Sequence, residues 1–477
     1  MNSNIDPQNI GLGRRKFLKQ SAIGAGLMVV PSYVVGQSAS MKSPNSRLNI
    51  ALVGVAGRGR SHTIEAQAEN VVALCDVDMG HVKNSRTGTD DDSVSFNEAL
   101  THHEKKGARW FKDYRVMFEE MGDKIDAVMV TTPDHMHYAI ALSALNLGKH
   151  VYCEKPLVHT VEQARSLTAA AARSGVVTQM GNQGHSNEGT RFVKEWIQAG
   201  LIGEIREVHS WTDRPARFWQ QGLPRPDHSN GAPPVPDGLD WKLWLGIAED
   251  RPYDPAYAPF NWRAYLDFGC GALGDMACHI MDSAYWGLEL GFPERIAADT
   301  TYVNGYTFPK VAHVKFNFPA RPDMAPVEYH WYSGGMMPVL PSFLKDFDLF
   351  KSEPLMTNGT IIVGDGAAIV TDTYSKSVQI YPREKFMELR QKLPPKTLPR
   401  VPKADHFTNW TDAIRESGRA CSDFSYAGPF TEMVNLGVIG IRVGRELRYD
   451  AKNGRFINDE EANKLLGRPI PDGWILG

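Results

Sequence analysis

Short apolar runs alternate with segments of helical periodicity from Leu48 onwards. The runs are rich in Val, Ala and Met and predict strands at 48–53, 71–78, 125–133, 150–156 and 176–183. Helical spacing of apolar residues follows Gly59 and recurs at 137–148 and 160–175. Strands that alternate with helices predict an α/β fold with a doubly wound parallel sheet.

The turn between the first strand and the first helix is rich in glycine. Against the pattern G-x-G-x-x-G, Gly54 and Gly59 match and Ala56 replaces the middle glycine. Such a turn lets the backbone approach a pyrophosphate that sits on the helix N-terminus, although any strand–turn–helix of an α/β protein shares part of the pattern. The expected cofactor-binding residues here are Gly54, Ala56, Gly57, Arg58 and Gly59.

Asp76 ends the second predicted strand and follows Gly54 by about 20 residues. At that spacing an acidic side chain accepts hydrogen bonds from the adenosine ribose. Its charge repels a 2′-phosphate, and Arg58 and Arg60 reduce that repulsion only in part. The sequence therefore predicts NAD as the cofactor, with NADP disfavoured.

The later strands end in polar residues, where ligands of doubly wound sheets bind. These ends are 131–137, 154–156 and 181–185. We expect further cofactor contacts from Thr132, Pro133, His137, Glu154 and Lys155, and substrate contacts from Asn182, Gln183 and His185. The last three residue types are also common in structural packing.

Asp275 and His279 lie one helical turn apart within "GALGDMACHIMD". The residues alone leave several interpretations open. Asp275 fits a helix N-cap after the turn "GALGD", and His279 fits a buried core histidine. Asp275, His279 and His135 fit a metal site, although no further carboxylate or Cys completes a recognisable pattern. An acid–base pair at an active site is the fourth interpretation.

Two aromatic segments suit the stacking of sugar rings. Trp262 and Arg263 belong to "FNWR", and Trp331 belongs to "HWYSGG". Aromatic side chains beside polar groups bind sugar faces, and they serve equally often in structural packing. Trp262, Arg263 and Trp331 are therefore expected substrate contacts.

The N-terminal segment carries a predicted export signal. Arg14 and Arg15 precede a variable residue and Phe17-Leu18-Lys19, and a short apolar run follows to Val35. This pattern resembles a twin-arginine signal. The run is too short to span a bilayer comfortably, so we expect no membrane span in the mature chain. Residues 1–40 are expected to be signal and linker, which places the protein in the periplasm.

Composition excludes some classes of protein. The chain has 477 residues, 42% hydrophobic residues and a formal net charge of −3, which fits a globular protein of two domains and does not favour nucleic-acid binding. The five cysteines form no CxxC pair, and an oxidising compartment permits a disulfide without requiring one. No resident metal is predicted.

The glycine turn, the strand ending in "EKP" and the downstream "GDMACH" together resemble the Gfo/Idh/MocA oxidoreductases. The resemblance implies an N-terminal Rossmann domain at 46–180 and a C-terminal α+β domain at 181–477 with a large, mostly antiparallel sheet. Alternating strands at 203–212, 311–320 and 360–372 suit that sheet. The family's lysine falls on Lys155, and its acid and histidine fall on Asp275 and His279.

The resemblance implies an NAD-dependent oxidoreductase that acts on a secondary hydroxyl of a sugar or glycoside. Imidazole suits the removal of the hydroxyl proton, and a lysine cation suits the stabilisation of alkoxide. The family also contains NAD-using glycosidases, which oxidise, eliminate, hydrate and reduce, but the N-acetylgalactosaminidase group lacks "EKP". A non-catalytic binding protein is the third alternative.

The family resemblance also implies a homo-oligomer with a carbohydrate substrate. The twin-arginine route carries folded proteins, so we expect the cofactor to be loaded before export and to stay enclosed. The Trp- and Pro-rich region 211–262 and the loop 338–346 are the segments expected to cover it.

Overall fold

The computed structural model describes residues 46–344 and 357–477. The predicted signal and linker at 1–40 lie outside the described residues. Leu48–Gly477 form one compact unit, so the expected boundary between residues 180 and 181 stays a prediction. In the described ranges, no helix combines the length and hydropathy that crossing a membrane requires.

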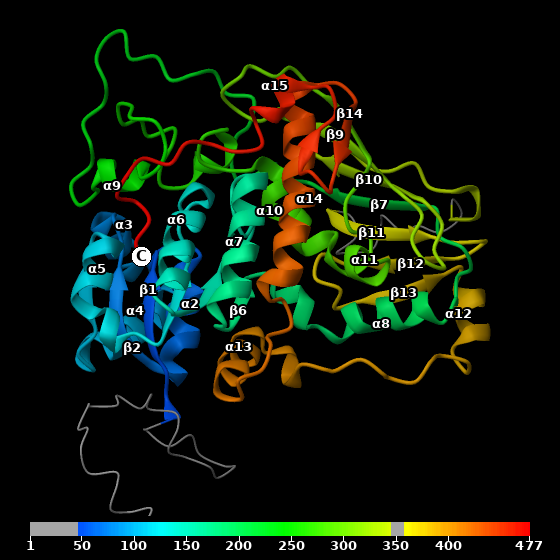
Figure 1. The fold of residues 1–477 in the computed structure, drawn as a ribbon, viewed down its shortest axis with the longest axis horizontal. Coiled ribbons are helices and arrows are strands. Elements are labelled where there is room, and N and C mark those ends of the chain that lie inside the picture. The colour runs from blue at the N-terminus through cyan, green and yellow to red at the C-terminus, as the bar shows by residue number, and fades with distance from the viewer. Residues whose placement is uncertain (1–45, 345–356) are drawn as a thin grey trace, which may run out of the picture. The chain divides into compact units, whose positions relative to one another are not determined.

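The first sheet has six strands in the order β3-β2-β1-β4-β5-β6, and all of its pairings are parallel (Figure 1). Its strands are β1 (Asn49–Val53), β2 (Asn70–Cys75), β3 (Arg109–Phe111), β4 (Ala127–Val130), β5 (His150–Cys153) and β6 (Thr178–Met180). The chain runs outward from β1 first through β2 and later through β4. The carboxyl ends of β1, β2 and β4 therefore form the point where ligands of such sheets bind.

Helices alternate with these strands, as the predicted fold class requires. They are α2 (Gly59–Glu65), α3 (Met79–Arg86), α4 (Asp91–Lys105), α5 (Tyr114–Met121), α6 (Asp134–Asn146) and α7 (Val161–Ser174). Asp90 caps α4 by accepting from the Ser93 amide, and Thr160 caps α7 by accepting from the Gln163 amide. The region 79–121, for which the sequence analysis predicted no element, adds α3, α4, β3 and α5 to this alternation.

The second sheet has nine strands in the order β13-β12-β11-β7-β10-β9-β8-β14-β15. They are β7 (Glu207–Thr212), β8 (Arg295–Thr300), β9 (Ala312–Phe318), β10 (Val327–Ser333), β11 (Asn358–Val363), β12 (Ala368–Thr371), β13 (Val378–Tyr381), β14 (Leu447–Asp450) and β15 (Arg455–Phe456). Only the β7–β10 pairing is parallel. This large, mostly antiparallel sheet and the parallel sheet confirm the predicted fold class.

Helices of the second half pack between and beside the sheets. They are α8 (Glu188–Gln198), α9 (Trp241–Leu245), α10 (Gly271–Ile280), α11 (Asp282–Gly287), α12 (Arg383–Leu389), α13 (His406–Arg415), α14 (Phe424–Val443) and α15 (Glu460–Asn463). Figure 1 shows α14 running between the two sheets beside α7. Arg165 of α7 donates to Glu432 of α14 at 2.6 Å, and one hydrophobic core includes residues of both sheets.

Helix α10 decides one alternative that the sequence left open. It begins at Gly271, and its N-cap is Cys270. Asp275 therefore lies inside the helix, with its side chain one turn before that of His279. The interpretation of Asp275 as a helix N-cap is wrong, because the helix begins at Gly271 and not after Asp275.

Candidate active site

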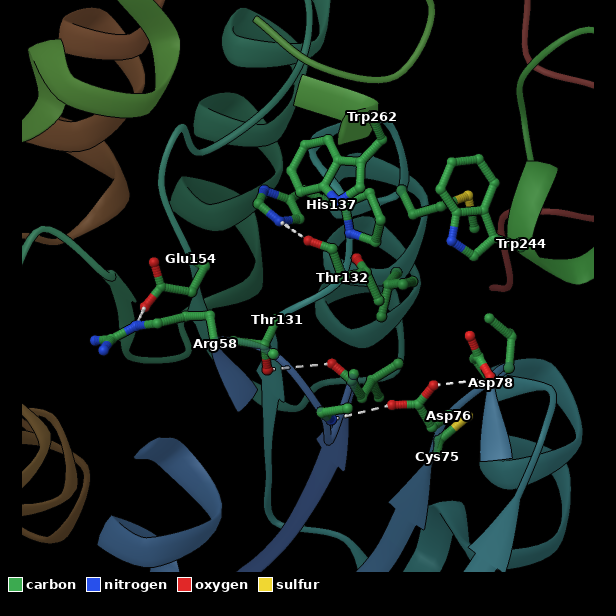
Figure 2. A pocket seen from close by; sticks show the side chains of 18 of the residues that line it. Arg58, Cys75, Asp76, Asp78, Thr131, Thr132, His137, Glu154, Trp244 and Trp262 are labelled. Atoms are coloured by element: carbon green, nitrogen blue, oxygen red, sulfur yellow. Dashed lines mark hydrogen bonds and ion pairs between the residues drawn. The ribbon is translucent and has the colours of Figure 1, made fainter. Parts of the chain in front are cut away.

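A cavity of about 400 Å³ opens at the carboxyl ends of β1, β2 and β4. The glycine turn and Asp76 form one part of its wall, and Lys155, Trp262 and Arg263 form another. Figure 2 shows the side chains that point into it from both halves of the chain. The cavity therefore lies where a doubly wound sheet binds its ligand.

The turn after β1 has no room for a side chain at Gly54 or Gly59. Gly54 has φ +85°, and a Cβ built on it would lie 2.7 Å from the backbone carbon of Thr131. A Cβ on Gly59 would lie 2.0 Å from the Gly54 oxygen. Gly57 has φ +58° and faces open space, while Ala56 and Arg58 also line the cavity. Such close packing of backbone on backbone is what a turn that approaches a pyrophosphate requires.

The carboxylate of Asp76 holds this turn in place. Its Oδ2 accepts from the amides of Val55 at 2.8 Å and Ala56 at 3.2 Å, and its Oδ1 accepts from the amide of Asp78 at 2.9 Å. Burial raises the pKa of Asp76, and these amides oppose that effect. Asp76 thus lies on the cavity wall at the expected ribose position and also fixes the turn.

Arg58 pairs with Glu154 rather than facing Asp76. Its Nε donates to Glu154 Oε1 at 3.0 Å, and His62 Nε2 lies 2.7 Å from the same oxygen. Burial alone would raise the pKa of Glu154, but the charge of Arg58 and the His62 hydrogen bond hold that pKa well below its usual range. Figure 2 shows Arg58 and Asp76 pointing in different directions. Arg58 therefore does little to offset the charge of Asp76.

The strand ends after β4 and β5 are tied together by His137. Its Nδ1 lies 2.8 Å from the carbonyl oxygen of Pro156, and its Nε2 lies 2.8 Å from that of Thr132. Thr132, Pro133 and His137 all line the cavity, as do Glu154 and Lys155. All the residues predicted to bind the cofactor, except Gly59, thus lie on one cavity wall, and Gly59 begins the adjoining helix α2.

Lys155 joins the first sheet to helix α10. Its Nζ donates to Asp275 Oδ1 at 2.8 Å and to the Asp275 carbonyl oxygen at 2.6 Å, and Arg263 Nε lies 3.3 Å from the same Oδ1. Burial alone would raise the pKa of Asp275, but the charges of Lys155 and Arg263 hold it well below its usual range. Asp275 is therefore an anion that positions two cations beside the cavity.

His279 lies one turn beyond Asp275, and both residues are buried behind the cavity wall. Burial and the charge of Lys155 lower the pKa of His279 to about 3, so its imidazole is neutral. Its Nδ1 has no hydrogen-bond partner among the described residues, and its ring packs 5.0 Å from that of Tyr374. His279 is thus a neutral acceptor beside the Lys155–Asp275 pair.

The structure does not assemble His135 with this pair. His135 Nε2 lies 3.1 Å from the carbonyl oxygen of Trp244, and within the described ranges His135 joins no metal-sized group with Asp275 and His279. The metal interpretation of these three residues is therefore wrong.

The predicted substrate residues separate into two groups. Trp262 and Arg263 line the cavity, with the Arg263 guanidinium 4.2 Å from the Trp262 ring centre. Gln183 is half-buried and is absent from the cavity wall. Its role in substrate binding stays a prediction.

Asn182, His185 and Trp331 have structural environments instead. Asn182 Nδ2 donates to Asp282 Oδ1 at 3.2 Å, and His185 Nδ1 lies 2.9 Å from Asp282 Oδ2. Trp331 is 0% exposed in the core behind the large sheet. None of these three side chains lines the cavity, so their expected substrate contacts stay predictions.

The cavity also contains residues that the sequence analysis missed. Trp474, near the C-terminus, lines the side formed by Asp113 and Tyr114, and its carbonyl oxygen accepts from the Tyr114 hydroxyl. The Arg115 guanidinium lies 4.2 Å from the Trp474 ring centre. The only sequence feature that pointed there was an aromatic residue in a Pro- and Gly-rich tail.

One of the two predicted covering segments lies at the cavity. From the region 211–262, Leu243, Trp244, Pro259 and Phe260 line it. The described part of the loop 338–346 packs elsewhere: Leu340, Phe343 and Leu344 belong to a hydrophobic cluster on the outer face of the large sheet that includes Trp211 and Ile361. The prediction that this loop covers the cavity is wrong for its described residues.

The residues on the cavity wall fit a dinucleotide. Gly57 of the turn faces open space, Asp76 lines the cavity at the end of β2, where such folds bind a ribose, and aromatic rings flank the cavity. The charge of Asp76, without an opposing arginine, fits NAD better than NADP.

Two family models match most of the chain. One, described as "Oxidoreductase family, NAD-binding Rossmann fold", matches residues 48–182. The other, described as "Oxidoreductase family, C-terminal alpha/beta domain", matches residues 191–302 and 359–476. The first agrees with the predicted NAD cofactor.

Curated relatives match over shorter segments. Levoglucosan dehydrogenase of Pseudarthrobacter phenanthrenivorans is 27% identical over 173 residues, which are 36% of this chain and 35% of that protein. The 1,5-anhydro-D-fructose reductase of Ensifer adhaerens is 40% identical over 86 residues, 18% of this chain and 26% of that protein. The matches span about a third or less of these two relatives.

Solved structures share the fold over most of the chain. Levoglucosan dehydrogenase in complex with NADH aligns with a TM-score of 0.53 and 16% identity, over 85% of this chain and 99% of that one. The aldose-aldose oxidoreductase of Caulobacter crescentus, complexed with glycerol, aligns with a TM-score of 0.53 and 15% identity, over 84% and 100%. From the two family models and the fold, we conclude that the chain belongs to the Gfo/Idh/MocA oxidoreductase family.

Proposed function

We propose that the protein is an NAD-dependent oxidoreductase that oxidises or reduces a secondary hydroxyl of a sugar or glycoside. The observation that carries the proposal is the position of Lys155. Its side chain lies on the same cavity as the glycine turn and Asp76, and Asp275 holds its cation in place. A fixed cation beside a dinucleotide-shaped cavity suits the stabilisation of an alkoxide.

Three side chains have separate roles in the oxidation. Bound NAD⁺ supplies the acceptor for the hydride that leaves the carbinol carbon. Lys155 donates a hydrogen bond to the hydroxyl oxygen and stabilises its developing negative charge. The hydroxyl proton passes to the neutral imidazole of His279; because His279 lies behind the cavity wall, one water molecule bridges the ring to the hydroxyl. Asp275 positions Lys155 and Arg263, since its low pKa keeps it from acting as an acid.

The substrate class follows from the aromatic wall. Trp262 and Phe260 offer ring faces, and Arg263 offers hydrogen-bond donors beside Asp275. Rings next to fixed polar groups suit a pyranose, which has apolar faces and a rim of hydroxyls. The names of the two curated relatives, both enzymes of anhydrosugars, agree with this class.

The products of a glycoside panel test the proposal. The purified protein is incubated with NAD⁺ and a panel of anhydrosugars, aldoses and aryl glycosides, and the products are separated by mass spectrometry. We expect a keto product from at least one of them, which is lost in Lys155→Met. Free sugar without a keto product would identify an NAD-using glycosidase instead. A protein that binds sugar and leaves it unchanged would be a binding protein.

We also propose that the protein is exported through the twin-arginine route. The support is the pair Arg14-Arg15 with Phe17-Leu18-Lys19. Fractionation of cells that express the full chain should find it in the periplasm, and the double substitution Arg14→Lys with Arg15→Lys should retain it in the cytoplasm. Equal export of both proteins would contradict the route.

A homo-oligomer is proposed from the family resemblance and the open outer face of the large sheet. The polar outer side of β7, β9 and β10 carries half-buried side chains such as Lys315 and Asn317. Light scattering coupled to size-exclusion chromatography should give a multiple of the 53.0 kDa chain. A monomer at micromolar concentration would contradict the proposal.

A further inference from the structure

Three potential metal ligands meet on the outer face of the large sheet. Glu207 and His209 lie two residues apart on β7, so their side chains point to the same face. His330 lies on the neighbouring strand β10 and is the register partner of His209. In the described ranges, these are the residues whose ligand atoms all lie within 4.8 Å of one another.

The distances between these atoms suit a small cation. Glu207 Oε1 lies 3.0 Å from His209 Nε2 and 3.9 Å from His330 Nε2. Ligands that bind zinc tetrahedrally at about 2.0–2.1 Å are separated by about 3.3 Å. The cluster therefore needs only small side-chain movements to enclose such an ion.

His209 offers an unused ligand atom at the centre of the cluster. Its side chain is 5% exposed, and its Nε2 makes no hydrogen bond to any described residue. Glu207 Oε1 is within 3.0 Å, but not in the direction that a hydrogen bond from the ring requires. Glu207 Oε1 and His209 Nε2 are therefore close without a hydrogen bond between them, which is the arrangement of two ligands of one ion.

Both imidazoles have second partners that fix the tautomer a metal needs. His209 Nδ1 lies 3.1 Å from the Tyr332 hydroxyl, and His330 Nδ1 lies 2.9 Å from His313 Nε2. When Nδ1 donates to these acceptors, Nε2 carries the free lone pair in each ring. Burial lowers the pKa of His209 and of His330 to about 4, so both rings are neutral.

Glu328 competes with the metal for one ligand. Its Oε1 lies 3.0 Å from His330 Nε2, and Lys315 Nζ lies 3.6 Å from its Oε2. In the absence of metal, the neutral His330 ring therefore donates from Nε2 to Glu328, and metal binding requires the other tautomer, with the proton on Nδ1. When an ion displaces the Nε2 proton, Glu328 keeps Lys315 and the Asn317 amide, 3.1 Å away, as partners.

We propose that Glu207, His209 and His330 form a binding site for a divalent ion of the zinc class, which clamps β7 to β10. Two imidazoles and one carboxylate are a typical zinc ligand set. The Glu207 side chain is 46% exposed, which leaves the fourth position to water. None of the three residues lines the proposed active-site cavity, so the metal site is distinct from it.

Metal titration of untagged, chelator-treated full-length protein tests the site. We expect isothermal titration with Zn²⁺ to show one ion per chain, with the same ratio by elemental mass spectrometry after desalting. Co²⁺ should give the intense visible absorption of a tetrahedral site with nitrogen ligands. Glu207→Gln and His330→Gln should each weaken Zn²⁺ binding at least tenfold, and Tyr332→Phe should weaken it by about 10–100-fold.

His228→Gln is the matched control, because His228 also pairs with a carboxylate, Asp254 at 3.1 Å, outside the cluster. Circular dichroism checks that each variant is folded. If His330→Gln does not fold, Zn²⁺ binding by Glu207→Gln decides whether the proposal holds. No stoichiometric Zn²⁺ binding, or binding that Glu207→Gln leaves unchanged while His228→Gln weakens it, would overturn the proposal.

Discussion

The Nζ atom of Lys155 contacts Asp275 twice, at 2.8 Å from its carboxylate and 2.6 Å from its carbonyl oxygen. Lys155 follows the fifth strand of the parallel sheet, whereas Asp275 lies inside helix α10 of the second half. The two contacts fix the cation relative to the cavity that both halves of the chain form. Fixed charge of this kind stabilises a transition state without reorganisation.

Lys155→Met should lower kcat by roughly 10²-fold or more, because it removes the donor to the alkoxide. The thermal unfolding transition should remain cooperative, since the substituted side chain is similar in length and the buried Asp275 keeps Arg263 at 3.3 Å. Steady-state kinetics and calorimetry measure the two effects. Lys105→Met, at an exposed position outside the cavity, is the control and should behave as the wild type. Equal activity of both variants would show that Lys155 is structural.

His279→Gln should lower turnover by about 10²–10⁴-fold, the usual contribution of a positioned acid–base group. The affinity for NAD should barely change, because His279 is absent from the cavity wall. Rapid-quench kinetics and a nucleotide titration separate the two quantities. Turnover that survives the substitution would mean that another group takes the proton.

The pH dependence of oxidation tests the electrostatics of His279. Its pKa of about 3 lies below the ordinary value, so the imidazole is neutral at any higher pH and loses its proton-accepting form only as the pH falls through about 3. We therefore expect kcat/KM to show no acidic limb near pH 6.5. An acidic limb centred there in the wild type, and absent in His279→Gln, would contradict the lowered pKa.

Asp76→Ala should weaken the binding of NAD and reduce the preference for NAD over NADP. The substitution removes the predicted ribose contact, the charge and the anchor of the Val55 and Ala56 amides. Loss of a charged hydrogen bond costs about 1.5–3 kcal/mol, which is roughly tenfold to a hundredfold in Kd. Titration calorimetry with NAD and NADP measures both Kd values. Asp76→Asn keeps one acceptor oxygen, so its Kd for NAD should lie between those of the wild type and Asp76→Ala. An unchanged preference would place the ribose contact elsewhere.

The expected export of the folded protein predicts that protein purified without added nucleotide carries NAD(H) through dialysis, since the cofactor would be loaded before export. Trp474→Ala should release it, because Trp474 closes the side of the cavity formed by Asp113 and Tyr114. Mass spectrometry of denatured samples measures the occupancy. Trp110→Ala, at a tryptophan outside this cavity, should retain the nucleotide. Wild-type protein that is isolated empty and needs millimolar NAD, a site of about −4 kcal/mol, would contradict the prediction.

Local patterns predicted the part of the cavity wall that one βαβ unit builds. The spacing of Gly54, Gly59 and Asp76 depends on a single turn and strand, so it can be read from the sequence. The face to which a residue of the large sheet points cannot be read in the same way. Trp331 is buried and its neighbour His330 is on the outer face, because side chains alternate along a strand and the sequence does not say which face holds the substrate.

Contacts between segments that are distant in the sequence could not be predicted either. The partner of His185 is Asp282, and Trp474 lies beside Tyr114, far away along the chain. These pairings depend on how the second half folds back onto the first, which neither periodicity nor spacing encodes. The cluster of Glu207, His209 and His330 could not be predicted for the same reason, since His209 and His330 meet only through the parallel register of β7 and β10.

Transfer of deuterium from sugar to nucleotide would demonstrate hydride transfer at this cavity. The protein is incubated with NAD⁺ and with levoglucosan or a methyl glycoside deuterated at its ring carbons, then denatured, and the nucleotide is analysed by mass spectrometry. We expect deuterated NADH and an equal amount of keto sugar in the wild type, and neither in Lys155→Met or His279→Gln. Keto sugar with unlabelled nucleotide, or equal label in the wild type and in both variants, would contradict hydride transfer at this cavity.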